Sequence, residues 1–210
     1  MHWPQRTSSE IDRVDTPEAI IVLRENARLK RPDFRKDVLS DLLRASLVML
    51  VSAIDAYFHA KIIAHVVRLA NKGTAMPKAL CKANISVGDF VKAKSYKRPM
   101  TVMRNALCEC LGYQALQSPD NISSALSLIG IKDFWSKVAG RMGAPKSEVV
   151  DGLKRIVKRR NQIAHEADLS QSKKARNSIT AIAPKDVRRA LGFSLKLIPR
   201  AEKEINSQLK

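Results

Sequence analysis

Hydrophobic positions recur every three or four residues along most of the chain, which is the period of one face of an α-helix. The longest such pattern runs from Asp33 to Lys72 without glycine or proline, and Gly73 supplies a stop. At 1.5 Å per residue, this pattern predicts a helix of roughly 60 Å. Residues 47–54 in its middle are apolar on nearly all sides, so we expect them to be buried in the centre of a bundle or at a subunit interface.

Proline, glycine and capping residues divide the remainder of the chain into shorter helices. The expected helices cover residues 16–30, 99–116, 121–139, 147–165 and 184–208, the last of them kinked at Pro199. We expect residues 1–15 to be flexible, 74–98 to form a surface insert and 168–183 to form an exposed basic loop. No segment has the period of a strand. The sequence therefore predicts one all-α domain over residues 1–210, a helical bundle with one very long central helix and additional short helices.

The helix expected over 147–165 carries charge where an apolar side chain is expected. Its apolar stripe consists of Val149, Val150, Leu153, Ile156, Val157, Ile163 and Ala164. At about 100° per residue, Arg160 projects from the middle of that stripe, while Asn161 and His165 flank it. Burial of an unpaired guanidinium is costly, so the pattern predicts a polar site inside a packed interface. For His165 alone, favourable interaction with the helix dipole is the simpler interpretation.

A carboxylate also lies on an apolar side of the long helix, at Asp55. Aspartate is almost never buried without a partner. Two alternatives follow: a cap-like bond to backbone or to a nearby serine, or an ion pair that holds Arg160. On the same helix His59 and His65 are badly spaced for joint metal ligation, and the three cysteines lack zinc spacing. We therefore expect no metal and no cofactor.

The charge narrows the class of partner. Lys and Arg outnumber Asp and Glu by 38 to 20, a net charge of +18 that favours a polyanion, with nucleic acid ahead of a membrane surface. The alternative is a basic protein that its charge keeps soluble. Four residues of the helix over 147–165 form either a solvated basic face or an RNA-binding surface: Lys154, Arg155, Lys158 and Arg159. Aromatic residues make up only 5% of the chain, so no base-stacking platform is evident.

The most apolar run, the first residues and the cysteines together indicate the cellular location. Arg44 and Asp55 break the most apolar run, Leu42 to Phe58, short of the ~18 residues that a membrane span needs. The first residues lack the apolar region of a signal peptide. An odd number of cysteines gives no disulfide framework, which suits a reducing compartment. We expect a soluble, cytoplasmic protein without a membrane partner.

The element Arg160-Asn161-Gln162-Ile163-Ala164-His165 resembles the HEPN superfamily, whose mark is Arg, a polar residue and then His. Four segments together are similar to its RiboL-PSP-HEPN branch: 42–63, 134–160, 159–168 and 184–187. The resemblance implies a helical fold, a two-fold homodimer and, in many members, metal-independent endoribonuclease activity in phage defence or toxin–antitoxin systems. It also implies a possible antitoxin or regulatory partner. Other members have lost activity and only bind RNA or act as scaffolds.

These side chains suit RNA cleavage without a metal. Histidine ionises near neutrality, so His165 can take the proton of a ribose 2′-OH and return one to the leaving 5′ oxygen. Arg160 can stabilise the charge that develops on the phosphate, while Asn161 orients the imidazole or holds a phosphate oxygen. The products would be a 2′,3′-cyclic phosphate and a 5′-hydroxyl. A nucleotide-handling transferase is less favoured, because no acidic metal pair is present.

The helix presents a geometric difficulty for this assignment. Five positions turn Arg160 and His165 about 140° apart, so they do not share a face. Three arrangements could bring them together: a long Arg160 side chain, a helix that loosens near Ala164, or a second copy of the chain. The third agrees with the expected homodimer, in which each site would be a composite of both chains at the two-fold interface.

Overall fold

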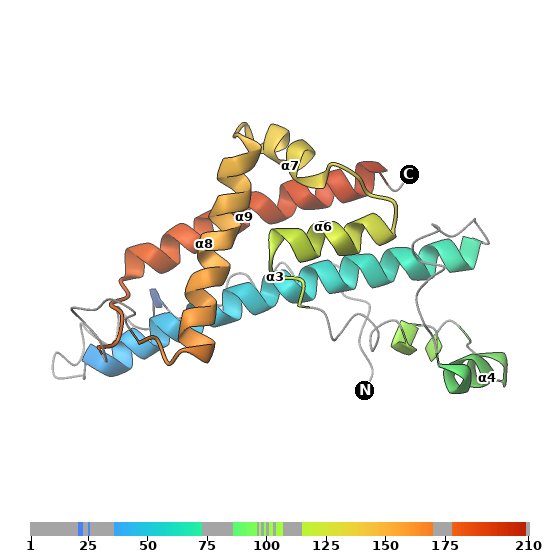
Figure 1. The fold of residues 1–210 in the computed structure, drawn as a ribbon, viewed down its shortest axis with the longest axis horizontal. Helices are drawn as coiled ribbons and strands as arrows, with labels where there is room; N and C mark the ends of the chain where they lie inside the picture. Colours follow the sequence, from blue (N-terminus) through green and yellow to red (C-terminus); the bar gives the residue numbers. More distant parts are fainter. Residues whose placement is uncertain are drawn as a thin grey trace. The chain divides into compact units, whose positions relative to one another are not determined.

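The computed structural model describes residues 21–22, 25, 36–72, 86–95, 97, 99, 101–102, 104–106, 115–169 and 178–208. Its helices are α3 (Lys36–Lys72), α4 (Val87–Ser95), α6 (Pro119–Leu128), α7 (Phe134–Met142), α8 (Lys146–His165) and α9 (Pro184–Gln208) (Figure 1). Within these ranges the only β-structure is an isolated antiparallel bridge between Leu169 and Ile179. The prediction of an all-α fold with one very long helix is confirmed.

The long helix α3 also meets the length and composition of a membrane span over residues 38–69, with a mean hydropathy of 1.6. The expectation that Arg44 and Asp55 rule out a span on composition is therefore wrong. The core helix of a soluble protein has the same composition, and Leu43, Leu47 and Leu50 of α3 are buried among protein side chains. Their burial favours a core helix.

The helix expected over 121–139 is instead two helices. Ser118 caps α6 by accepting a hydrogen bond from the Asn121 N–H, and Pro119 occupies the first turn, where its missing N–H costs nothing. After α6 the chain turns through Gly130 (φ 86°) and Asp133 (φ 53°), both in the left-handed region. These conformations end one helix and start α7, so the prediction of a continuous helix is wrong.

Other expected elements are described only in part. Residues 1–15 lie outside the described residues, as does most of 16–30. Within the helix expected over 99–116, the described residues 99, 101–102 and 104–106 are helical. The helix α4 lies within the expected insert 74–98. The helix expected from Pro184 is α9, which continues through Pro199. The kink at Pro199 stays a prediction.

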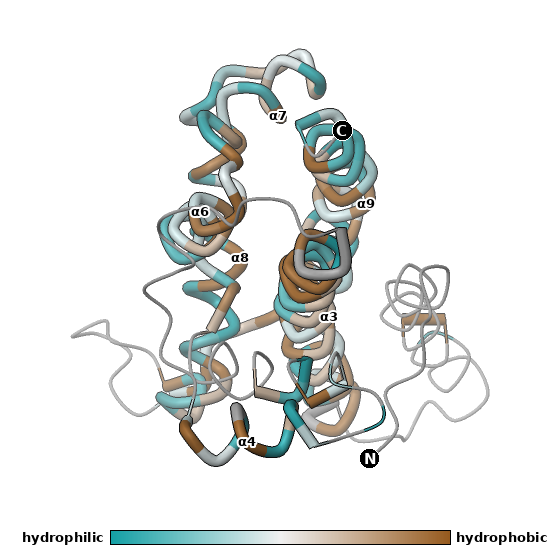
Figure 2. The backbone as a smooth tube through the Cα atoms, turned by 90° about the vertical axis from the view of Figure 1, so that its right-hand side faces the viewer, coloured by the Kyte–Doolittle hydropathy of each residue, from teal (hydrophilic) through white to brown (hydrophobic). Residues whose placement is uncertain are grey.

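The chain divides into two compact units, each built from two stretches of sequence. Unit 1 contains residues 1–54 and 147–199, and unit 2 contains residues 55–146 and 200–210. Both α3 and α9 therefore contribute residues to each unit, and the prediction of a single domain stays a prediction. Figure 2 shows that apolar residues dominate α3, whereas α8 and α9 alternate between apolar and polar positions.

The core of unit 1 joins α3, α8 and α9. One cluster consists of Leu47, Leu50, Ala190 and Leu191, with Ile156 and Ile163 packed against it. A second contains Ile21, Leu43 and Val187, with Ile182 beside it. Burial of a large aliphatic side chain stabilises the fold by about 1.5–3 kcal/mol. These contacts fix α8, which carries the Arg160 element.

The core of unit 2 includes aromatic rings and one buried carboxylate. Phe134 and Trp135 pack edge to face at 4.9 Å, and the Trp135 indole N–H donates to the Pro119 carbonyl at 2.9 Å. The buried Glu204 carboxylate accepts from Arg141 Nε at 2.7 Å. Burial raises the pKa of Glu204, but hydrogen bonds from Arg141 and Gln208 and the nearby positive charges outweigh it, so the pKa is lowered overall.

Candidate functional site

The helix α8 buries one face in unit 1 and exposes the other. Val149, Leu153 and Val157 are buried, as the apolar stripe predicts, and Gly152 is buried beside them. Val150 and Ile156 of the stripe are half-buried. The stripe emerges toward the C-terminal end, where Ile163 is half-buried and Ala164 is exposed. Arg160 is half-buried, and its Nε atom is buried without a hydrogen-bond partner among the described residues. A guanidinium with one orphaned buried nitrogen is costly unless it serves an interaction that the isolated chain lacks.

The three residues of the expected site contact one another within one chain, and we call them the Arg160 cluster. Arg160 Nη1 donates to Asn161 Oδ1 at 3.1 Å and lies 3.3 Å from His165 Nε2. Because α8 remains helical through His165, the long Arg160 side chain spans the angular separation, and neither a loosened helix nor a second copy is needed for this contact. The composite dimeric site stays a prediction.

The contact between Arg160 and His165 constrains the imidazole. A guanidinium can only donate hydrogen bonds, so the Nε2 atom accepts and carries a lone pair rather than a proton. His165 is exposed to solvent. Once Arg160 turns to an anionic substrate, the Nε2 electron pair becomes available, which is what a general base needs.

Next to this cluster lies a saturated ionic network, which we call the Asp168 cluster. The Asp168 carboxylate, 3% exposed, accepts from Arg44 Nε at 2.6 Å and from Arg159 Nη2 at 2.9 Å, and Arg159 Nη1 donates to its other oxygen. The Thr180 carbonyl accepts from Arg44 at 2.9 Å and from Arg159 at 3.3 Å, and the Thr180 N–H donates to the Asp168 carbonyl at 2.8 Å. Every charge in this cluster has a partner.

This network corrects two expectations. Residues 168–183 were expected to form an exposed loop. Asp168 departs from this expectation because it is buried, whereas Leu169 and Ile179, which form the bridge, are exposed, and residues 170–177 lie outside the described residues. Arg159 was expected on an outward basic face, but its guanidinium is held by Asp168. Lys154, Arg155 and Lys158 are exposed, as expected, and their role in RNA binding stays a prediction.

The turn that ends α8 explains why the carboxylate is buried. Ala167 and Asp168 both adopt the left-handed conformation, at φ 50° and 57°, and the Asp168 N–H donates back to the Gln162 carbonyl at 2.9 Å. Two consecutive non-glycine residues in this region cost about 1–2 kcal/mol each. The ion pairs of Asp168 offset that strain, so the Asp168 cluster fixes the turn that begins directly after His165.

Of the two alternatives for Asp55, the structure supports a bond to backbone. Asp55 Oδ1 accepts from the Leu116 N–H at 2.5 Å, and Oδ2 lies 3.8 Å from His59 Nδ1. Arg160 has no ion pair among the described residues, and its contacts are Asn161 and His165. The interpretation that Asp55 holds Arg160 is therefore corrected, because the Asp55 carboxylate is satisfied inside unit 2.

The sequence did contain a signal for the Asp168 cluster. Arg44 interrupts an apolar run of α3 just as Arg160 interrupts that of α8, and both positions predict a partner. Asp168 gave no such signal, because it follows the end of the helical period. Among the described residues, no three His, Cys, Asp or Glu side chains lie close enough to hold a metal ion.

Comparison with known proteins agrees with the resemblance carried by the Arg-to-His element. Residues 20–209 match the family described as RiboL-PSP-HEPN, which is most of the chain. No curated protein and no solved structure matches the chain. Membership in a HEPN family indicates ribonuclease or RNA-binding function. From the match, the helical fold and the Arg160 cluster, we conclude that the chain belongs to the RiboL-PSP-HEPN family.

Proposed function

We propose that the protein is a metal-independent endoribonuclease whose chemical groups are His165 and Arg160. The observation that carries this proposal is the Arg160 cluster: a half-buried guanidinium without a carboxylate among the described residues, 3.3 Å from an exposed imidazole. A cation that has no anionic partner among the described residues is suited to receive one from a ligand. RNA supplies that anion, and the net charge of +18 favours it.

The reaction follows from the two side chains. His165 Nε2 accepts the proton of the ribose 2′-OH, the 2′ oxygen bonds to phosphorus, and the bond from phosphorus to the 5′ oxygen breaks. The imidazolium then returns a proton to the departing 5′ oxygen. Arg160 leaves Nε2 and donates to the phosphate oxygens as their charge increases, while Asn161 keeps its contact with Arg160. The products are a 2′,3′-cyclic phosphate and a 5′-hydroxyl, and DNA is inert because it lacks the 2′-OH.

The proposal also includes the biological role of the protein and its oligomeric state. The resemblance to HEPN ribonucleases supports a role in phage defence or in a toxin–antitoxin system, with an antitoxin or regulatory protein as partner. It also supports a cytoplasmic homodimer with the Arg160 cluster near the two-fold axis. Analytical ultracentrifugation at activity-assay concentrations tests the dimer, and a fully active monomer would exclude it.

The proposal is tested with labelled single-stranded RNA in the presence of EDTA. We expect wild-type protein to cleave it and to leave cyclic phosphate ends, and His165→Ala and Arg160→Ala to lose cleavage. Lys203→Ala, which removes an exposed positive charge in unit 2, is the matched control and should cleave normally. Cleavage that requires added Mg²⁺ would refute the mechanism. Wild-type protein that binds RNA and leaves it intact would instead identify a binding-only member.

A further inference from the structure

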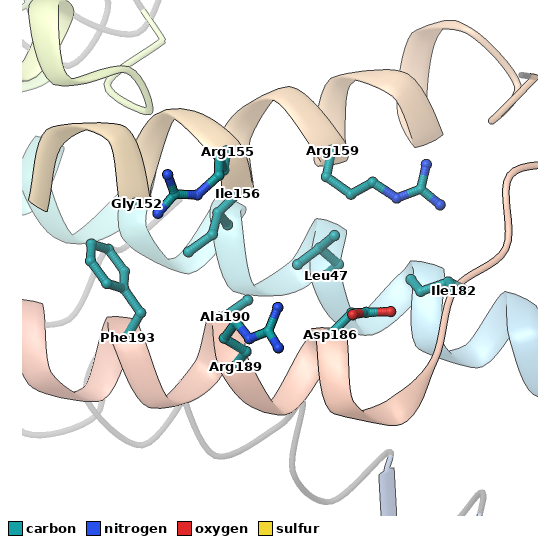
Figure 3. Close-up of a pocket in the computed structure, with 10 residues that line it drawn as sticks. All are labelled: Leu47, Gly152, Arg155, Ile156, Arg159, Ile182, Asp186, Arg189, Ala190 and Phe193. Atoms are coloured by element: carbon teal, nitrogen blue, oxygen red, sulfur yellow. The ribbon is translucent and has the colours of Figure 1, made fainter. Parts of the chain in front are cut away.

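Unit 1 contains a cavity of about 300 Å³ that the Arg160 cluster does not use. It lies among α3, α8 and α9, and Figure 3 shows its lining: Leu47, Gly152, Arg155, Ile156, Arg159, Ile182, Asp186, Arg189, Ala190 and Phe193. Ligand sites in proteins have volumes of about 300–1,000 Å³, so the cavity is large enough for one small planar group.

The floor of the cavity is apolar and includes an aromatic ring. Figure 3 shows the Phe193 side chain pointing from α9 toward Gly152 of α8. A Cβ atom on residue 152 would lie 2.7 Å from Phe193 Cε2, closer than packed atoms tolerate. Glycine at this position therefore lets the ring lie directly against the α8 backbone. Leu47 and Ala190, which also line the cavity, are buried.

The rim of the cavity carries more positive than negative charge, because three arginines and one aspartate line it. Arg155 and Arg189 are exposed, and neither has a hydrogen bond or ion pair within the described part of the chain. The Asp186 carboxylate is engaged elsewhere, since it accepts from the Ala183 N–H at 3.0 Å as a helix cap. Arg159 is held by Asp168. Two guanidiniums thus remain available beside an apolar, aromatic floor.

We propose that this cavity binds one nucleotide of the RNA substrate, with its base on the Phe193 side and its phosphate between Arg155 and Arg189. The proposal rests on the ribonuclease function above. A base has an apolar face that stacks on an aromatic ring, and a phosphate accepts paired hydrogen bonds from a guanidinium. A fatty acid would leave the second arginine unpaired, and an acidic peptide would not fill a flat aromatic floor.

The position of the cavity along α8 suits an RNA strand that reaches the Arg160 cluster. Arg155 and Arg159 line the cavity, and His165 follows Arg159 on the same helix. From Arg155 to His165, ten residues of helix rise about 15 Å, so one extended strand can contact both places. The cavity then selects where the strand lies, while His165 acts on a phosphate further along that strand.

Binding is tested in the His165→Ala protein, so that the outcome is independent of cleavage. Isothermal titration with adenosine monophosphate, adenosine and inorganic phosphate should give measurable affinity for the monophosphate and at least tenfold weaker binding of either part. Arg189→Ala should weaken binding about tenfold, which is the loss of one charged hydrogen-bond pair. Arg188→Ala is the matched control, because Arg188 is the adjacent arginine, pairs with the exposed Glu25 and does not line the cavity.

Equal affinity for inorganic phosphate and the monophosphate, or equal effects of Arg188→Ala and Arg189→Ala, would overturn the proposal. A 2′-O-methyl RNA oligonucleotide that cannot be cleaved should displace the bound monophosphate. If it does not, the cavity takes a free nucleotide and its assignment to the RNA substrate is wrong. Displacement in a protein whose wild type does not cleave RNA would support the cavity and refute the ribonuclease function.

Discussion

Two neighbouring arginines of α8, Arg159 and Arg160, have opposite environments. Arg159 belongs to the Asp168 cluster, where a buried carboxylate and the Thr180 carbonyl satisfy it. Arg160 contacts an amide and an imidazole, and its Nε atom is buried without a partner among the described residues. One position on the same helix thus separates a satisfied cation from an unsatisfied one.

The difference distinguishes a cation engaged in an ion pair of the fold from one to which the proposed function assigns a ligand. Removing one partner of a buried ion pair strands the other charge, so the Asp168 cluster is expected to matter for stability. Removing Arg160 strands no carboxylate among the described residues, so the cost should appear in activity. We therefore expect substitutions in the Asp168 cluster to lower stability and substitutions in the Arg160 cluster to lower activity.

The largest expected effect is on activity in the Arg160 cluster. His165→Ala should lower the rate of RNA cleavage by about 10²–10⁴-fold, because the general base is lost. Its melting temperature should remain that of wild type, since His165 is exposed. Calorimetry and single-turnover cleavage of the same preparations compare the two. A large decrease in the melting temperature of His165→Ala would show that the Arg160 cluster also contributes to stability, contrary to the prediction.

The next largest effect is on stability in the Asp168 cluster. Asp168→Ala should lower the free energy of unfolding by about 3–5 kcal/mol, because Arg44 and Arg159 lose their shared carboxylate. Asp168→Asn should be milder, since asparagine tolerates the left-handed conformation and keeps an acceptor. Urea denaturation measures both. An Asp168→Ala protein as stable as wild type would show that the cluster does not hold the turn.

A smaller effect is expected at Asp55, the carboxylate once considered a partner of Arg160. Asp55→Ala should cost about 1–3 kcal/mol of stability, because the Leu116 N–H loses its acceptor. The rate constant for RNA cleavage by folded protein should not change. Loss of activity without loss of stability would restore the discarded pairing with Arg160.

The smallest effect concerns acid stability and extends the comparison to unit 2. Because the pKa of Glu204 is lowered in the folded state, its carboxylate stabilises unit 2 above the ordinary glutamate value of 4.5, and this contribution is lost as pH falls through the lowered value. Glu204→Gln should flatten the decline of melting temperature below pH 4.5. An unchanged slope would show that Glu204 contributes little to the acid transition.

Two kinds of feature could be predicted from the sequence: helices with a regular apolar period, and charged residues that interrupt such a period. The long apolar period predicted α3, and the single cation in the α8 stripe predicted the Arg160 cluster, because both depend on local spacing. The break between α6 and α7 was missed, since Gly130 and Asp133 depart from helix only through their backbone angles.

Contacts between distant residues were beyond the sequence. Arg44 and Asp168 lie 124 positions apart, and no periodicity relates them. The same holds for the cavity, which brings together Phe193 and two arginines, Arg155 and Arg189, that have no ion pair among the described residues. A low aromatic content predicted no stacking platform, yet one ring in the right place can serve.

The Asp168 cluster also bears on how the protein is made. Arg44 belongs to the first third of the chain, whereas Asp168 and Thr180 come late in synthesis. The left-handed turn behind His165 can close only after residue 180 has left the ribosome, because only then are all of its partners present. A nascent chain would thus carry His165 before the turn that follows it is held by ion pairs. Under the proposed function, the ribosome's own RNA would meet the complete site only after translation is nearly complete.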